Sequence, residues 1–149
     1  MTPDVTKVLR ALAVAFGTQL MPEVRTPFAQ QTVGLSATLL MLLAQDFDRA
    51  AASLAEENIV VRGLLGQAAG MAGDEGLRSR IGELLGRAPN ADLRISALTR
   101  ENNEARRLLV EVHAAVEELS GSAARELDGL IWDELRRSTA RRHVEGMLG

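Results

Sequence analysis

Two stretches of the chain, LAEENIVVRGLL at Leu54–Leu65 and LTRENNEARRLL at Leu98–Leu109, decide which fold it can adopt. In both stretches, apolar residues recur at the three- and four-residue steps that place side chains on one face of a helix. A strand needs alternation at every second residue, and no window of the sequence sustains it. We therefore predict an all-α fold, a helical bundle with an internal helix repeat.

The two stretches also repeat a polar pattern. Each carries Glu, Asn and Arg at the same spacing, and the six residues are Glu57, Asn58, Arg62, Glu101, Asn102 and Arg106. Each asparagine falls on or beside the apolar seam, where an unpaired amide is costly. If the two helices run parallel, Asn58 can hydrogen-bond Asn102, as a buried asparagine fixes register in parallel coiled coils. Each glutamate can then face the arginine of the other copy.

Three interpretations of this repeat are open. In the first, it aligns two parallel helices. In the second, the copies are separate polar positions in unrelated helix contacts. In the third, the same six residues form a pocket for a small polar ligand.

The composition is that of a globular protein. The 149 residues fit one domain, 1–149, with 46% hydrophobic and 25% charged residues. Aromatic residues are only 3%, so Leu, Val, Ile and Ala must build the core, which suits packed helices. A net charge of −3 argues against a nucleic-acid-binding surface. The absence of cysteine excludes disulfides, thiolate metal sites and cysteine nucleophiles.

Capping residues and prolines divide the chain into four to five helices. The second helix is long: it begins at Thr26–Pro27, runs to about Gly63, and is either continuous or kinked near Asp46. Asp74 is placed to cap a short third helix, and Asp92 to begin a long fourth. A final helix follows the break at Ser120–Ser122.

The second helix begins with an uncharged stretch, Thr26 to Gln45. Its glutamines, serine and threonines are too many polar groups for a lipid-facing span. The stretch from Thr26 to Ala44 is nevertheless apolar around more than one face, which exceeds the need of a single core contact. We therefore expect a cytoplasmic homo-oligomer, most simply a dimer, that binds neither membrane nor nucleic acid.

No motif in the sequence indicates a metal, a cofactor or a catalytic site. Di-metal helical bundles use Glu-x-x-His, but Val110 precedes His113 by three residues and Ala140 precedes His143. We expect His113 to be a boundary residue satisfied by water or a neighbour. No catalytic residue is predicted.

Four arginines, Arg136, Arg137, Arg141 and Arg142, cluster near the C-terminus. They are placed to bind a small anionic ligand such as a phosphate or a CoA-like group. The alternative is salt bridging to acidic residues of neighbouring helices.

Three phrases carry a resemblance to a known group of proteins: Leu20–Val24, Glu57–Leu65 and Asp92–Glu118. They resemble an uncharacterised bacterial all-helical family often encoded beside phosphotransferase-like and acyl-CoA dehydrogenase-like proteins. The resemblance implies an accessory role in acyl-CoA or related small-molecule metabolism, and no catalytic residues.

The sequence thus predicts a helical interaction or assembly module, homo-oligomeric and without catalytic activity of its own. The alternative is a small-ligand-binding accessory protein. The expected partner is a second copy of the chain, and the others considered are another protein or a small anionic ligand.

Overall fold

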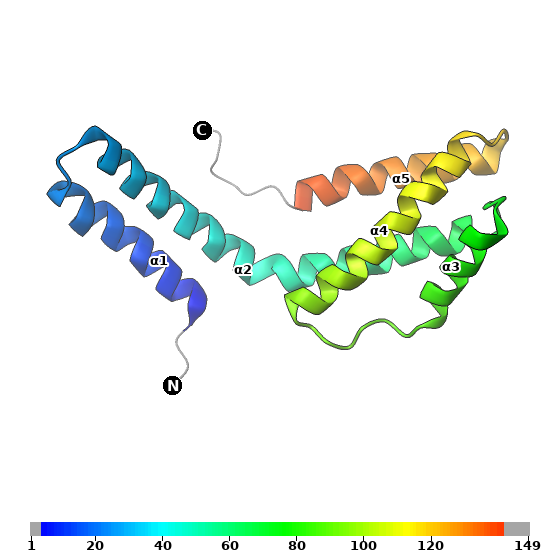
Figure 1. The fold of residues 1–149 in the computed structure, drawn as a ribbon, viewed down its shortest axis with the longest axis horizontal. Coiled ribbons are helices and arrows are strands. Elements are labelled where there is room, and N and C mark those ends of the chain that lie inside the picture. The colour runs from blue at the N-terminus through cyan, green and yellow to red at the C-terminus, as the bar shows by residue number, and fades with distance from the viewer. Residues whose placement is uncertain (1–3, 142–149) are drawn as a thin grey trace. The chain divides into compact units, whose positions relative to one another are not determined.

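The computed structural model describes residues 4–141, which are helical over most of their length (Figure 1). No strand occurs within this range, so the predicted all-α fold is confirmed. A π-helical turn η1 (Phe16–Leu20) and a 3-10 turn η2 (Met21–Glu23) lie between the first two α-helices. The α-helices are α1 (Val5–Ala15), α2 (Pro27–Ala68), α3 (Glu75–Gly86), α4 (Ile95–Glu117) and α5 (Ser122–Arg141).

The described chain falls into two compact units, and α2 contributes to both. The hairpin unit contains α1, η1, η2 and α2 as far as Ala50. The bundle unit contains α2 from Ala51 onward together with α3, α4 and α5. The single domain expected from the chain length stays a prediction.

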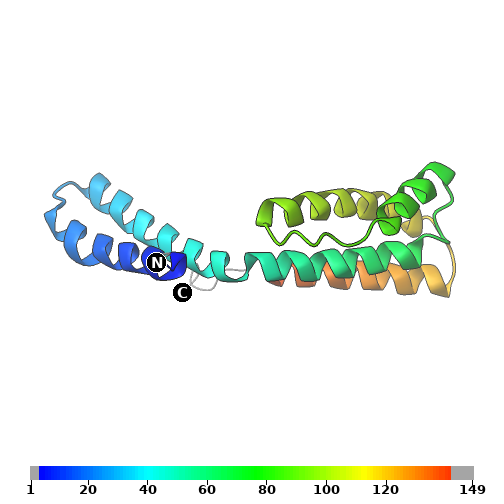
Figure 2. The same cartoon turned by 90° about the horizontal axis from the view of Figure 1, so that it is seen from below.

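The hairpin unit consists of two antiparallel helices side by side (Figures 1 and 2). Asp4 caps α1 by accepting a hydrogen bond from the backbone N–H of Lys7 at 3.1 Å. Thr26 caps α2 by accepting one from Ala29 N–H at 3.3 Å, and Pro27 occupies the first helical position, where its missing N–H costs nothing. The interior of the hairpin is narrow, since its buried residues include Ala13 and Val33.

In the bundle unit, α2 and α4 run in the same direction, while α3 and α5 return in the opposite one (Figures 1 and 2). The short α3 therefore allows the two copies of the repeat to lie parallel, which is the condition for the first of the three interpretations of the repeat. The core contains Val61, Leu64, Leu65, Ala68, Ala72, Leu77, Ile81, Leu84, Ala105, Leu108, Leu109, Val112, Val116, Ala124, Leu127 and Ile131.

Some helix ends differ from expectation. Asp74 caps α3 as predicted, accepting from the N–H groups of Gly76 at 3.3 Å and Leu77 at 2.8 Å. Asp92 does not begin α4, which starts at Ile95. The Asp92 carboxylate instead accepts hydrogen bonds from the backbone N–H and the guanidinium of Arg94, and Arg94 remains extended.

The second helix is longer than predicted. α2 continues past Asp46 without interruption and ends at Ala68 rather than near Gly63. The reason is packing: Leu64, Leu65 and Ala68 are buried in the core. Burial of this apolar face outweighs the low helix propensity of the glycines.

Candidate functional site

The two asparagines of the repeat are hydrogen-bonded to each other. Asn102 Nδ2 donates to Asn58 Oδ1 at 2.9 Å, and Asn58 Nδ2 donates to the backbone carbonyl of Leu98 at 3.1 Å. Both asparagines are buried, with 4% and 3% of their surface exposed. The pair therefore satisfies amide groups that would be costly if unpaired.

The charged residues of the repeat pair across the same two helices. Arg106 Nη1 contacts the Glu57 carboxylate, and Arg62 Nη1 lies 3.5 Å from Glu101 Oε1. Each ion pair joins a glutamate to the arginine of the opposite copy, the arrangement expected from the matched spacing. Both ion pairs join α2 to α4, as charged pairs join the two helices beside the seam of a parallel coiled coil.

Arg62 also binds the end of α3. Its guanidinium donates to the carbonyls of Leu84 at 3.0 Å, Leu85 at 3.3 Å and Arg87 at 2.6 Å. The last carbonyls of a helix lack partners within the helix. Arg62 supplies the missing donors to these carbonyls, and it also pairs with Glu101. One side chain therefore links α2, α3 and α4. No pattern in the sequence indicates this link, because its acceptors are backbone carbonyls, which every residue carries.

A second polar cluster lies where α5 meets α2 and α4. Arg106 Nη1 also donates to Ser138 Oγ at 3.0 Å, and Arg141 binds the carboxylate of Glu134. Glu134 is 3% exposed, and within the described residues its Oε2 has no hydrogen-bond partner. Burial raises the pKa of Glu134 above its usual value; Arg141 opposes this shift and nearby Glu57 adds to it.

The six repeat residues do not present a free set of groups to a ligand, because they bind one another. A shallow depression of about 240 Å³ does lie beside Arg62 and Glu101, bordered by Arg87, Arg100 and Glu104. Arg87 is already paired with Glu104. Asn102, Arg106 and Glu57 do not line this depression.

The C-terminal arginines do not share one binding surface. Arg136 points into solvent beside Asp133, with 75% of its side chain exposed. Arg141 is 15% exposed and pairs with Glu134 and, at 3.7 Å, with Glu56. Arg137 borders a separate depression, and Arg142 lies outside the described residues. Arg136 pairs within α5, whereas Arg141 pairs both within α5 and with Glu56 on the neighbouring α2.

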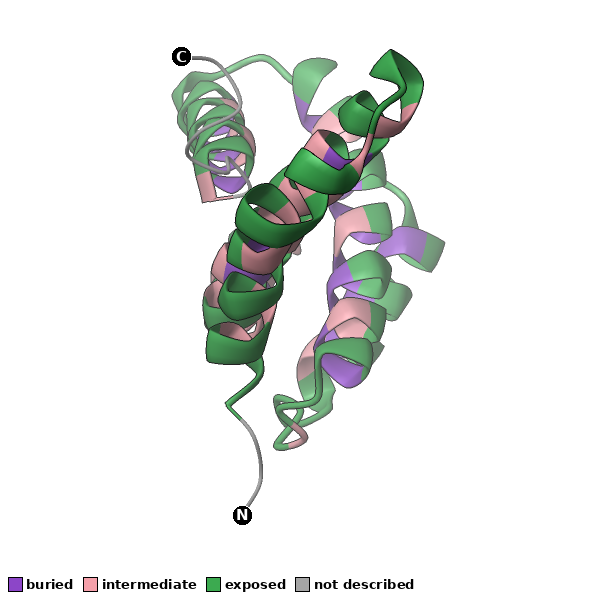
Figure 3. Cartoon of the chain, turned by 90° about the vertical axis from the view of Figure 1, so that its left-hand side faces the viewer, coloured by how far each residue is buried: buried purple, intermediate pink, exposed green. Residues whose placement is uncertain are grey.

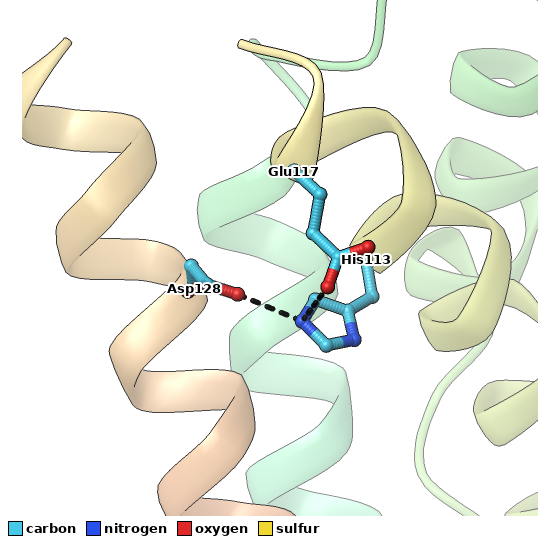
Figure 4. A group of neighbouring side chains, drawn as sticks. All are labelled: His113, Glu117 and Asp128. Carbon is cyan, nitrogen blue, oxygen red and sulfur yellow. Dashed lines mark hydrogen bonds and ion pairs between the residues drawn. The ribbon is translucent and has the colours of Figure 1, made fainter. Parts of the chain in front are cut away.

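His113 is bound by neighbours that the sequence did not indicate (Figure 4). Its Nε2 lies 2.8 Å from Asp128 Oδ1 on α5 and 3.6 Å from Glu117 Oε1 on α4. The cluster does not match Glu-x-x-His, because the order here is His-x-x-x-Glu with a second carboxylate from another helix. The spacing of His113 and Glu117 was the available signal.

Many residues of the hairpin unit are exposed (Figure 3), and several of them have large apolar side chains. On α2, the exposed residues at helical spacing are Phe28 (80%), Leu35 (59%), Leu39 (48%) and Leu43 (54%). On α1, Val5, Val8 and Leu12 are each more than 40% exposed. We call these seven residues the apolar stripe. By length and composition alone, α2 is also the one described helix that could cross a membrane.

Comparisons with protein-family models, curated proteins and solved structures found no significant match to the chain.

Proposed function

We propose that the protein is a non-catalytic helical assembly module that forms a homodimer through the apolar stripe of the hairpin unit. The observation that carries this proposal is the exposure of large side chains from Phe28 to Leu43. Monomeric soluble proteins rarely expose contiguous apolar surface of this kind unless it binds a partner.

The stripe is not part of the contact between α1 and α2. At about 100° per residue, Leu35 and Leu39 lie roughly a third of a turn or more from Val33, which is buried in the hairpin. α2 is therefore apolar on two sides, and α1 covers only one. Two helices form a single layer, and a single layer needs a second to bury its outer face.

The polar side chains on this part of α2 are compatible with burial. The hydroxyls of Thr32, Ser36 and Thr38 donate to the carbonyls of Phe28, Thr32 and Gly34, each one turn earlier in the same helix, at 2.8–3.0 Å. These donors are already satisfied, so covering them leaves no unpaired hydroxyl.

The size of the surface fits a dimer. The part of α2 in the hairpin unit is roughly 36 Å long, and two adjacent helices are roughly 20 Å wide. The face is then on the order of 700 Å², close to the roughly 800 Å² per partner of a standard interface. A second copy would complete a four-helix bundle, in which each hairpin buries its outer face against the other.

A shallow apolar depression of about 290 Å³ lies on the other face of the hairpin, well over a quarter-turn around α2 from the apolar stripe. It lies between α1 and α2 and is lined by Ala13, Val14, Ala37, Thr38 and Met41. The second copy is the favoured occupant because the α2 part of the stripe carries no charge between Arg25 and Asp46, so an isologous contact between two copies of α2 brings no like charges together.

Light scattering coupled to size exclusion, from about 1 µM to about 100 µM protein, tests the proposal. We expect a mass of twice 16.0 kDa for the wild type. Leu39→Glu should weaken dimerisation on the order of 100-fold, since each copy loses a buried leucine and gains a buried charge.

The matched control is Val110→Glu, which adds the same charge at a residue 70% exposed in the bundle unit. It should leave the dimer intact. A wild type that stays monomeric throughout the range contradicts the proposal, as does a monomer that instead binds phosphatidylcholine vesicles through Leu39.

The second candidate is the small-ligand-binding accessory protein, favoured by the depression beside Arg62 and Arg100. Its volume, about 240 Å³, is below the range of roughly 300–1,000 Å³ typical of ligand pockets. It suits a small anion better than an acyl-CoA. A thermal shift with acyl-CoAs and nucleotides, abolished by Arg100→Ala, would support this function over the first.

A further inference from the structure

The strongest unassigned cluster of side chains lies between α4 and α5 in the bundle unit (Figure 4). It consists of His113 and Glu117, one turn apart on α4, and Asp128 on the antiparallel α5. One ligand atom from each residue, the imidazole Nε2 and a carboxylate oxygen from each acid, lies within 4.8 Å of the other two.

We propose that His113, Glu117 and Asp128 bind a divalent first-row transition metal ion, with zinc as the reference ion. One imidazole and two carboxylates are ligands that such ions accept. The two carboxylate charges balance the charge of the ion, and the three protein ligands leave a coordination position for water.

The distances are close to those that coordination requires. In a tetrahedral site with ligands at about 2.0–2.2 Å, the ligand atoms are separated by roughly 3.4 Å. His113 Nε2 is already 3.6 Å from Glu117 Oε1, and its 2.8 Å contact with Asp128 Oδ1 needs to lengthen only slightly. Side-chain rotation of the two carboxylates is enough to complete the site.

The imidazole is positioned and the acids are accessible. The His113 ring packs edge-on against Trp132, with ring centroids 5.4 Å apart, and 15% of its side chain is exposed. Glu117 and Asp128 are 56% and 37% exposed. A solvated ion can therefore reach the cluster, and a water molecule can fill the remaining position.

Metal binding exchanges one proton on His113 for the ion. In the metal-free protein, a hydrogen bond from His113 to the carboxylate of Asp128 requires the proton on Nε2, because an ionised carboxylate can only accept. Coordination replaces the Nε2–H bond with an Nε2–metal bond, and the proton leaves to solvent. The bound ion then joins α4 to α5 across the turn between them, so it stabilises the folded bundle unit.

Trp132 makes this site directly observable, because it is the only tryptophan in the chain. The experiment uses untagged full-length protein treated with a chelator and then dialysed. Zinc chloride is titrated while Trp132 fluorescence and the thermal midpoint are recorded. We expect a saturable fluorescence change at one ion per chain and a rise in the midpoint.

His113→Gln and Asp128→Asn should each weaken zinc binding on the order of 10-fold or more. Glu118→Gln is the matched control: it removes the same charge from the residue next to Glu117, outside the cluster, and should bind as the wild type does. Circular dichroism of each metal-free variant establishes that it is folded.

Three results would overturn the proposal. The first is no saturable change up to millimolar zinc. The second is equal weakening by Glu118→Gln and Asp128→Asn, which indicates nonspecific attraction to acidic surface. The third is loss of binding in His143→Gln with retention in His113→Gln, which assigns the ion to the other histidine.

Discussion

Asn102 donates a side-chain hydrogen bond to Asn58 at 2.9 Å across two parallel helices, and Asn58 in turn donates to the carbonyl of Leu98 at 3.1 Å. That carbonyl lies one helical turn before Asn102. The position of α2 relative to α4 is therefore fixed both by a side chain and by the backbone, and a slip of either helix along its axis would break both bonds.

The asparagine pair predicts strong coupling between two substitutions. Asn58→Ala and Asn102→Ala should each cost about 1–3 kcal/mol in the free energy of unfolding, because each strands a buried amide. The double variant should cost less than the sum of the two, by roughly 1 kcal/mol or more. Urea unfolding followed by Trp132 fluorescence reports on the bundle unit.

Asn103→Ala is the control for this cycle, since Asn103 is exposed on the same helix. Its cost should stay within about 0.5 kcal/mol. Strict additivity of the two buried substitutions would contradict a direct Asn58–Asn102 interaction.

We expect the α2–α3–α4 junction to depend on the planar guanidinium of Arg62 and not on its charge alone. Its fork donates to three carbonyls at the end of α3 while 13% of the side chain is exposed. Lysine has no planar fork, so Arg62→Lys should lower the free energy of unfolding by roughly 2–4 kcal/mol, nearly as much as Arg62→Met. Hydrogen exchange should show the loss of protection concentrated in α3. Arg100→Lys, at an exposed arginine, should change neither the free energy of unfolding nor the protection of α3. An Arg62→Lys variant as stable as the wild type would contradict the capping role.

The contacts of the repeat could be predicted from the sequence because identity and spacing coincide. Leucine spacing predicts a helix, but many polar residues can sit beside a seam. The match of Glu57, Asn58 and Arg62 to Glu101, Asn102 and Arg106 restricts the pairing once the helices are parallel, and the short α3 indicates that they are. Both the matched residues and the shortness of α3 can be recognised in the sequence without knowing the fold.

Other features depend on contacts that no local pattern contains. The division of α2 between two units depends on which residues α1 and α5 cover, although α2 itself is one continuous pattern. The cluster of His113 and Asp128 depends on how α5 returns from the turn at Gly121. A difference of one residue in that turn would move Asp128 by about 100° around its helix.

Two glycines predict opposite effects of the same substitution. Gly121 lies between α4 and α5 with φ +134°, a conformation that L side chains rarely adopt, although no atom would contact an added Cβ. Gly121→Ala should therefore destabilise the bundle unit by about 1–2 kcal/mol. Gly129 is exposed within α5 and is equally free of steric contact, so Gly129→Ala should stabilise it by about 0.5–1 kcal/mol. Thermal unfolding of both variants gives the comparison, and effects of the same sign would be inconsistent with the observed backbone.

Glu134 predicts how the stability of the bundle unit depends on pH. Burial raises the pKa of its carboxyl in the folded protein above the ordinary value of 4.5, against the opposing effect of Arg141. The folded state then holds the proton more tightly than the unfolded state. Stability from this group is fully present below pH 4.5 and falls as pH rises towards the folded-state pKa, by at most about 1.4 kcal/mol per pH unit.

Glu134→Gln replaces the carboxyl with a neutral group of similar shape and removes this dependence. The stability of the variant relative to the wild type should increase as pH rises from 4.5, and then level off above the folded-state pKa of Glu134. Unfolding measured at a series of pH values tests this, with Glu126→Gln on the exposed face of α5 as the control of equal charge. If the variant instead loses relative stability with rising pH, Arg141 outweighs burial, and the folded-state pKa of Glu134 lies below its usual value.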